Sequence, residues 1–399
     1  MSTSRRCLWL SAELPARPTT GLHGYSAGLR RGLAAAGVGI DVLGLGPPEG
    51  EEAPGVRRRP VPGTLQGWSG SLTSPLPAVS HAPATRAYRA AVHEALAERA
   101  WDAVVIDHLQ MAWVARAHPG LGAARGGPPL VFVTHNHEAT VRAASAAEHP
   151  LWTPQGLVLR ADSRKAARLE AATVAVADLV TTITEDDADA FRAGVVPGRS
   201  LPGRFVVLPP GYDDPSVVPV PAACRARRVV MVGSFEWHVK AANLRQFLLA
   251  ADPVLAAAGV ELVVVGRVPE PVLEKLRPHL RATRFAGWVE RLADVLGDAR
   301  LAVVDEPVGG GFKMKTLDYV FHHVPVAATA GSVRGLDLDD GMLEAPDAGS
   351  LARLLVSVVD DPERLDGLAD RAYRSAAERF DWLRTGVRLA AALEGVPVP

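Results

Sequence analysis

Two lysines follow a run of three glycines in the second half of the chain, and these residue types suit the binding of phosphate. Gly309, Gly310 and Gly311 carry no side chains, so the backbone can approach a ligand closely there. Lys313 and Lys315 start a stretch with helical periodicity, where free N–H groups already create a positive field. A bound polyanion would relieve that field. A glycine turn made only for tight packing, with lysines reaching into solvent, is the alternative.

Polar residues also follow an apolar run in the first half of the chain. His135, Asn136 and Glu138 come directly after the run 130–133. His135 and His137 are two residues apart and have no matching partner elsewhere, which argues against a metal site. A neutral histidine that exchanges hydrogen bonds with a ligand fits this position better.

His108 and Gln110 follow another apolar run, 103–106. Ligands of open α/β sheets lie beyond the carboxyl ends of the strands, so these two residues are candidates for ligand contacts. The alternative is that they only begin the next helix.

These residues are placed by a pattern of short apolar runs that alternate with helical periodicity. Strands are predicted at 8–10, 40–45, 103–106, 130–133, 174–183, 229–232, 261–266 and 301–304, and helices at 25–36 and 85–99. The segment 47–83 reads as irregular, and its Arg57, Arg58 and Arg59 read as a solvated surface more readily than as an anion site. The pattern predicts parallel sheets built from βαβ units.

Length, charge and cysteine content exclude several classes of protein. The chain has 399 residues, enough for two α/β domains. Its formal net charge of −1 gives no field that would attract nucleic acid. Two cysteines allow neither a disulfide framework nor a cysteine metal cluster and suit a reducing cytoplasm. An NAD-dependent enzyme is disfavoured because no clean G-x-G-x-x-G follows the first strand.

The motifs resemble those of glycosyltransferase family 4. The glycine turn, Lys313, Lys315, Leu317, Asp318 and the segment 324–329 resemble the signature G-x-G-x-K-x-K…L-E-A…G-x-P-V-V-A-T. The segment 233–247 is similar to the family's G-S-F-x-W…N-x-x-x-x-F-L loop, and 206–213 to V-x-P-N-G-V-D. Members often carry two glutamates eight residues apart in the first of these motifs; Gly310 and Asp318 stand at those positions here.

The resemblance implies an α/β protein of GT-B fold, with two Rossmann-like domains facing a central cleft. It divides the chain into an acceptor-binding domain at 1–212, a linker at 213–226, a nucleotide-sugar-binding domain at 227–375 and a C-terminal helix at 376–399 that crosses back to the first domain. It also implies a retaining enzyme that takes its sugar from a UDP-, GDP- or dTDP-linked donor, with no metal and no other cofactor.

The resemblance assigns roles to residues of both halves. Catalytic roles fall on His135, Lys313 and Lys315. Donor contacts fall on Gly24, Gly233, Ser234, Lys240, Trp288, Gly309, Gly310, Gly311, Phe312, Met314 and Asp318. Acceptor contacts are expected, from their side-chain chemistry and their place in loops or after strands, of His23, Tyr25, His108, Gln110, Asn136 and Glu138.

We therefore expect a cytoplasmic glycosyltransferase with a soluble, small-molecule acceptor and no stable membrane association. High Ala, Gly, Arg and Pro usage suggests a GC-rich bacterium, and the expected pathway is natural-product biosynthesis. Two alternatives stay open. One is a non-catalytic protein that binds sugar nucleotides, because Gly310 stands where the family has a glutamate, and the other is an enzyme of cell-surface polysaccharide assembly.

Overall fold

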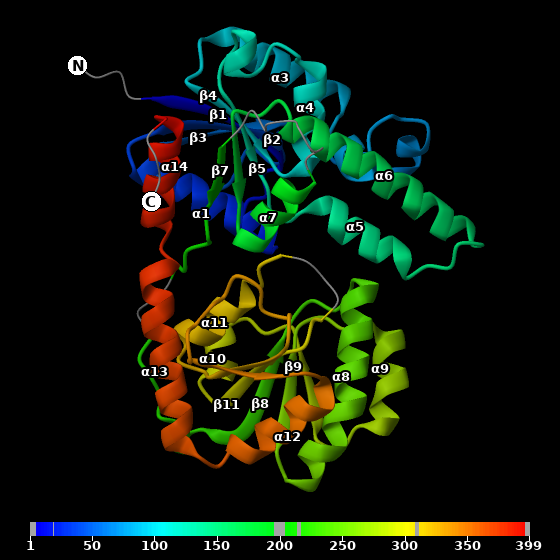
Figure 1. Cartoon of the computed structure of the whole chain (residues 1–399), viewed down its shortest axis with the longest axis vertical. Helices are drawn as coiled ribbons and strands as arrows, with labels where there is room; N and C mark the ends of the chain where they lie inside the picture. Colours follow the sequence, from blue (N-terminus) through cyan, green and yellow to red (C-terminus); the bar gives the residue numbers. More distant parts are fainter. Residues whose placement is uncertain (1–4, 19, 195–203, 214–216, 308–310, 396–399) are drawn as a thin grey trace. The chain divides into compact units, whose positions relative to one another are not determined.

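The chain folds into two compact units, each built on its own parallel sheet. The computed structural model describes residues 5–18, 20–194, 204–213, 217–307 and 311–395. Unit 1 comprises Met1–Gly211 together with Asp381–Pro399, and unit 2 comprises Tyr212–Phe380. Figure 1 shows the sheet of each unit with helices packed along it.

The sheet of unit 1 has seven strands in the order β3-β2-β1-β4-β5-β6-β7. Its strands are β1 (Arg6–Glu13), β2 (Gly39–Leu45), β3 (Val56–Val61), β4 (Ala103–Asp107), β5 (Leu130–Val133), β6 (Leu179–Thr182) and β7 (Arg204–Val207). Its α-helices are α1 (Gly21–Ala35), α2 (Ala78–His81), α3 (Arg86–Glu98), α4 (Trp113–Ala117), α5 (Glu138–Ala147), α6 (Pro154–Val174), α7 (Glu185–Ala193) and α14 (Trp382–Leu393). Short 3₁₀ turns are η1 (Trp68–Leu72), η2 (Leu109–Met111) and η3 (Ala123–Arg125).

The sheet of unit 2 has six strands in the order β10-β9-β8-β11-β12-β13. Its strands are β8 (Ala226–Val232), β9 (Glu261–Val265), β10 (Thr283–Gly287), β11 (Ala299–Val304), β12 (Val326–Thr329) and β13 (Met342–Ala345). Its α-helices are α8 (His238–Ala257), α9 (Glu270–Leu276), α10 (Leu292–Leu296), α11 (Lys315–Phe321), α12 (Ala348–Val358) and α13 (Pro362–Arg379), with 3₁₀ turns η4 (Ala222–Cys224) and η5 (Arg277–His279).

The central strands are apolar on both faces because helices cover both faces of each sheet. In unit 2, Val229 and Met231 of β8 belong to one buried cluster, which includes residues of α8 and α12. Val230, between them, belongs to a second cluster with residues of α11 and α13. Successive side chains of a strand point to opposite faces, so a strand between two helical layers must be apolar throughout.

In each sheet the strand order reverses direction at one point. In unit 1 this point lies between β1 and β4, and in unit 2 between β8 and β11. The loops that leave neighbouring strands there turn to opposite faces, which opens a crevice beyond the carboxyl ends. The lysine cluster of unit 2 and the hollow of unit 1 described below lie near these two points, at the ends of β11 and of β1 and β4.

Two sequence expectations need correction. The predicted strand 174–183 is wrong in its first half, because α6 continues to Val174 and β6 covers only Leu179–Thr182. The segment 47–83 is not wholly irregular, since β3 pairs in parallel with β2 and forms an edge of the sheet. Arg57 is exposed as expected, but the side chain of Arg58 is only 9% exposed. The sequence did not predict β3 because it is an edge strand. Only one of its sides pairs with a neighbour, so its sequence can stay polar.

No helix within the described ranges is long and apolar enough to cross a membrane.

Candidate active site

Unit 2 gathers two lysines and a glutamate beyond the carboxyl end of β11. Lys313 lies just before α11, and Lys315 is its first residue. Both ammonium groups contact the carboxylate of Glu306: Lys313 Nζ lies 3.4 Å from Oε2, and Lys315 Nζ contacts Oε1. All three side chains are largely buried. The alternative interpretation of the sequence required both lysines to reach into solvent. Their burial contradicts it.

Burial and charge act in opposite directions on this cluster. Burial alone would raise the pKa of Glu306, but the charges of Lys315, Lys313 and Lys240 outweigh it and lower the pKa to about 2. Burial lowers the pKa of both lysines, and the charge of Glu306 opposes that change. The charge of Lys240, on α8, acts on Glu306 and on both lysines.

Hydrogen bonds from the next loop hold the strand end that carries Glu306. The Glu306 N–H donates to Ser332 Oγ at 2.8 Å. Thr329 Oγ1 donates to Asp305 Oδ1 at 2.7 Å and lies 2.7 Å from Ser332 Oγ. The Asp305 carboxylate thus accepts a hydrogen bond from Thr329, while the neighbouring Glu306 carboxylate contacts both lysines.

Unit 2 also contains a hollow, lined in part by glycines and a tryptophan, beyond the ends of β9 and β10. It is lined by Glu236, Gly266, Arg267, Val268, Pro269, Leu273, Phe285, Gly287 and Trp288, and it encloses about 880 Å³ counted with its part open to solvent. Trp288 is 69% exposed, so its ring is not a core residue and offers a free face. A flat apolar wall with polar residues nearby suits a nucleotide base.

Close backbone contact explains the glycines at this edge. A Cβ on Gly266 would lie 1.8 Å from the carbonyl oxygen of Gly233, and the φ of Gly266 is 114°. Only glycine tolerates both constraints. Ser234 follows Gly233 at the surface and donates to Glu236 at 3.1 Å. Gly233 and Ser234 therefore lie beside the hollow that Trp288 lines.

Asp318 of α11 lies partly buried and is hydrogen-bonded to a tyrosine. Tyr212 Oη donates to Asp318 Oδ1 at 3.2 Å, and the Tyr212 ring stacks on Phe321 with 4.3 Å between the ring centroids. Burial raises the pKa of Asp318 to about 6, and the nearby charge of Asp213 adds to this effect. This carboxyl group can therefore change its protonation state close to neutral pH.

The structure describes only some of the remaining predicted donor-binding residues of unit 2. Gly309 and Gly310 lie outside the described residues. Gly311 has a φ of 71°, a conformation that favours glycine. The Phe312 ring packs against Phe380 with 5.4 Å between the centroids, and Met314 is the residue before α11.

In unit 1, Asp107 at the end of β4 accepts hydrogen bonds from four side chains. Trp9 Nε1 and Ser11 Oγ donate to Oδ2, each at 2.8 Å, and Ser26 Oγ donates to Oδ1 at 3.0 Å. His135 Nε2 lies 2.9 Å from Oδ1. Burial would raise the pKa of Asp107, but the bonds from His135 and Trp9 outweigh it and hold this pKa below its usual range. Asp107 is a buried carboxylate that orients His135.

His135 is itself buried and packs edge-on against two rings. Its ring centroid lies 5.0 Å from that of Tyr25 and 5.2 Å from that of His108. Burial lowers the pKa of His135, while Asp107 opposes this change. A neutral imidazole whose Nε2–H points to Asp107 leaves Nδ1 as a hydrogen-bond acceptor.

His108, Asn136 and Glu138 form a second network next to the first. His108 Nε2 donates to Glu138 Oε1 at 3.2 Å, since its Nδ1 accepts from the Gln110 N–H at 3.3 Å. Asn136 Nδ2 and Arg142 Nε also donate to Glu138, at 3.4 and 2.8 Å. His108 has a φ of 68°, which is rare outside glycine and which these bonds help to maintain.

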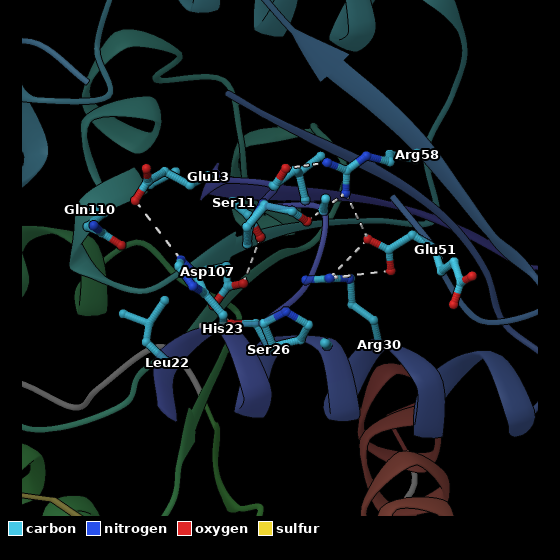
Figure 2. A pocket seen from close by; sticks show the side chains of 17 residues that line it. Ser11, Glu13, Leu22, His23, Ser26, Arg30, Glu51, Arg58, Asp107 and Gln110 are labelled. Carbon is cyan, nitrogen blue, oxygen red and sulfur yellow. Dashed lines mark hydrogen bonds and ion pairs between the residues drawn. The ribbon is translucent and has the colours of Figure 1, made fainter. Parts of the chain in front are cut away.

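A hollow of about 490 Å³, part of it open to solvent, lies between the end of β1, helix α1 and the loop after β4. Figure 2 shows its lining, with His23 and Ser26 on α1 and Gln110 across from them. His23 and Gln110, both predicted acceptor residues, are therefore in one site.

The other predicted residues of unit 1 do not line this hollow. Tyr25 is buried, and its hydroxyl donates to the Leu208 carbonyl at 2.8 Å. His108, His135 and Glu138 lie buried beside it, in the networks described above. Gly24 lies in the first turns of α1, and a Cβ there would meet no neighbour within 4 Å.

Two sequence comparisons match family profiles along most of the chain. Residues 20–211 match the family described as "Glycosyl transferase 4-like domain", and residues 226–361 match "Glycosyl transferases group 1". The chain belongs to the GT4-type glycosyltransferases. No curated protein matches this glycosyltransferase in sequence.

Solved structures agree with the GT-B fold of this glycosyltransferase. Sucrose-phosphate synthase from Thermosynechococcus elongatus has a TM-score of 0.69 and 18% identity, with 98% of each chain covered. HepE from Anabaena in complex with UDP has a TM-score of 0.65 and 16% identity, with 98% of this chain and 100% of HepE covered. An E. coli protein described as "Trehalose-6-phosphate from E. coli bound with UDP-2-fluoro glucose" has a TM-score of 0.66 and 13% identity, with 99% and 100% covered.

Sequence reasoning missed several residues of the candidate sites in the two units of this glycosyltransferase. Asp107 and Glu306 each lie at or just beyond the carboxyl end of a buried strand, which is the signal that singled out His108 and His135. Gly266 directly follows β9, and Gly287 is the last residue of β10. Among the described residues, no group of three or more His, Cys, Asp or Glu side chains is placed to hold a metal ion.

Proposed function

We propose that this glycosyltransferase moves a sugar from a nucleotide-diphosphate sugar to a soluble small molecule, with retention of the anomeric configuration and without a metal ion. The observation that carries the proposal is the largely buried lysine pair, Lys313 and Lys315, whose ammonium groups contact one carboxylate. Ammonium groups that are fixed in a largely buried position, with the charge of Lys240 acting on both, suit the anionic oxygens of a diphosphate.

The chemistry follows from where charge develops. As the bond between the anomeric carbon and the β-phosphate oxygen breaks, negative charge grows on the departing nucleotide diphosphate. Fixed ammonium groups stabilise that charge without reorganisation at the moment of reaction. The acceptor oxygen then bonds to the anomeric carbon, and its proton passes to the departing phosphate. In this scheme the lysines do the work that a divalent cation does in other transferases.

The base of the nucleotide is proposed to lie in the hollow of unit 2 that Trp288 lines. Its size falls in the range of small-molecule sites, about 300 to 1,000 Å³. Asp318 is proposed to accept hydrogen bonds from the ribose, as the family resemblance implies.

The acceptor is proposed to bind in the hollow of unit 1 (Figure 2). The lining offers the hydroxyl groups of Ser11 and Ser26 and the side chains of His23 and Gln110, which can exchange hydrogen bonds with a polyhydroxylated molecule. Glu13, Glu51, Glu52 and Asp107 outnumber the cations Arg30 and Arg58 in this lining. That excess of carboxylates favours a neutral or aminated acceptor over a phosphorylated one, which fits a natural-product pathway better than polysaccharide assembly.

A panel of UDP-, GDP- and dTDP-sugars tests the proposal. We expect one nucleotide class to raise the melting temperature of the protein and to be hydrolysed slowly in the absence of acceptor, with EDTA present throughout. Candidate acceptors are then scored by mass spectrometry, and the product anomer is read by NMR. An inverted product contradicts retention, and activity that appears only with magnesium or manganese contradicts metal independence.

The second candidate function is binding of a sugar nucleotide without transfer. It is favoured by Gly310, which stands where the family has a glutamate. Binding of a sugar nucleotide with neither hydrolysis nor transfer to any acceptor in the panel would establish this alternative. Absence of binding to every nucleotide would reject both functions.

A further inference from the structure

Glu306 is a buried carboxylate that links both lysines of the proposed diphosphate site. Only 5% of the residue is exposed, and its two oxygens face different partners, Oε2 toward Lys313 and Oε1 toward Lys315. Its backbone N–H is held by Ser332 Oγ, so the strand end is fixed independently of the side chain. Glu306 lies before the glycine turn with which the family motif begins, and the comparisons give this residue no role.

The charges that face this pair come from several elements. Lys240 on α8 acts on Glu306 and on both lysines, and Arg334 acts on Lys313 from the loop after β12. Asp305 also lies close to Lys315, but it is hydrogen-bonded to Thr329 and burial raises its pKa. Glu306 is therefore the carboxylate in direct contact with both ammonium groups.

Without that carboxylate, buried ammonium groups would stand side by side. Burial lowers the pKa of each lysine, Lys240 lowers both further, and Lys313 lowers that of Lys315, whereas the charge of Glu306 opposes these changes. A lysine that loses its proton no longer attracts phosphate.

We propose that Glu306 is a positioning residue that keeps Lys313 and Lys315 charged and fixed in place for the diphosphate of the donor. The inference rests on the proposed function, because it assigns the diphosphate to these lysines. Glu306 acts through the lysines and needs no contact with the sugar. Its effect must therefore appear in the pH dependence of nucleotide binding.

The test compares nucleoside diphosphate affinity of the wild type and Glu306→Gln by calorimetry between about pH 6.5 and pH 9. We expect the wild-type affinity to change less than about threefold over this range, because both lysines stay charged. In Glu306→Gln the affinity should fall by about tenfold or more as pH rises, because one lysine loses its proton. Glu306→Asp keeps the charge and should restore the flat profile.

Controls separate this role from a general loss of structure. Glu344→Gln removes an exposed carboxylate of the same unit and should leave the profile flat. Circular dichroism checks the fold of each variant. If Glu306→Gln does not fold, NMR titration of ¹³C-methylated lysines in the wild type, assigned with Lys313→Ala and Lys315→Ala, reports their charge directly.

The outcomes distinguish this inference from the proposed function. A flat profile in Glu306→Gln, or neutral Lys313 and Lys315 in the wild type where binding is still tight, overturns the role of Glu306 and leaves the proposed function standing. A wild type that binds no nucleoside diphosphate at any pH overturns both.

Discussion

At the scale of single residues, the site depends on where charge is buried. Lys313 and Lys315 are held against Glu306 in a largely buried position, whereas lysines on a protein surface contribute little through their ion pairs. A buried ion pair is costly to assemble, so this cluster is weak evidence for a gain in stability.

The first prediction concerns the lysine pair. A nucleoside diphosphate should raise the melting temperature of the wild type, because a ligand that binds only the folded state stabilises it. Lys313→Ala combined with Lys315→Ala should remove most of that rise, since the phosphate oxygens lose both charged partners. Differential scanning fluorimetry measures the shift. Lys275→Ala, an exposed lysine of α9, is the matched control. An unchanged shift in the double variant would reject the assigned phosphate site.

The second prediction concerns His135. Its imidazole is oriented by Asp107 through a 2.9 Å contact, as suits a group that contacts the sugar at the reacting centre. His135→Ala should lower the transfer rate by about a hundredfold and nucleotide affinity by less than about threefold, because the contact matters most in the transition state. Single-turnover kinetics and calorimetry measure the two effects. His93→Ala, a histidine of α3 in the same unit, is the control. Equal losses in rate and affinity would show that His135 is structural.

The third prediction is a pH dependence carried by Asp318. Burial raises its pKa to about 6, so the carboxyl group is charged above that pH and gains a proton below it. A protonated carboxyl accepts hydrogen bonds poorly, and nucleotide affinity should fall by about tenfold between about pH 7.5 and pH 5.

Asp318→Asn supplies the comparison for this prediction. The amide does not titrate, so its affinity should be lower at neutral pH and should not depend on pH over the same range. A wild-type affinity that is constant down to about pH 5 would contradict the assigned role.

At the scale of elements, unit 1 depends on the close crossing of α1 and α14, which Figure 1 shows side by side. A Cβ on Gly32 would lie 2.0 Å from the Trp382 carbonyl oxygen, and a Cβ on Gly386 would lie 2.0 Å from the carbonyl carbon of Gly32. Helices that approach this closely require glycine at the contact. The C-terminal segment therefore belongs to unit 1 by packing, although unit 2 intervenes in the sequence.

The fourth prediction compares two glycines of α1. Gly32→Ala should lower the free energy of unfolding by about 1 to 3 kcal/mol, because the methyl group meets backbone that cannot move aside. Gly24→Ala is the matched control: its methyl group meets nothing, and alanine favours a helix by up to about 1 kcal/mol over glycine. Urea unfolding followed by circular dichroism measures both. Equal stability of the two variants would contradict the close crossing.

At the scale of the whole molecule, charge and surface decide which partners the protein attracts. The formal net charge is −1, so no overall field draws the chain to anionic surfaces. Unit 1 does expose apolar side chains between α5 and α6, with Trp152 84% exposed and Leu151 61% exposed. A patch of this kind is the part of the described surface where a membrane contact would be sought.

The fifth prediction follows from this balance. In sedimentation with anionic liposomes the protein should stay in the supernatant, because a formal net charge of −1 adds no long-range attraction to the apolar patch. It should then glycosylate a water-soluble acceptor. Leu151→Ser with Trp152→Ser tests the patch itself. Liposome binding that this double variant abolishes, together with transfer only to a lipid-linked acceptor, would overturn the prediction.

Much of the architecture follows from local sequence signals. Apolar runs bounded by turn residues predicted most strands of both sheets, and the parallel pairing followed from the helices between them. These signals are local because a strand covered on both faces must be apolar along its length. Edge strand β3 escaped detection because it is half exposed and rich in arginine.

The sequence by itself also indicated the chemistry of the second half, since glycines and lysines lie close together in the chain there. Only the tertiary structure decided which groups they meet. Glu306, just beyond β11, contacts both lysines. Asp107 accepts hydrogen bonds from side chains of three separate segments: Trp9 and Ser11 of β1, Ser26 of α1, and His135 after β5. Tyr25, a predicted acceptor residue, is buried by the same folding. Burial and side-chain partners depend on contacts between distant segments, and a local pattern of residues does not specify them.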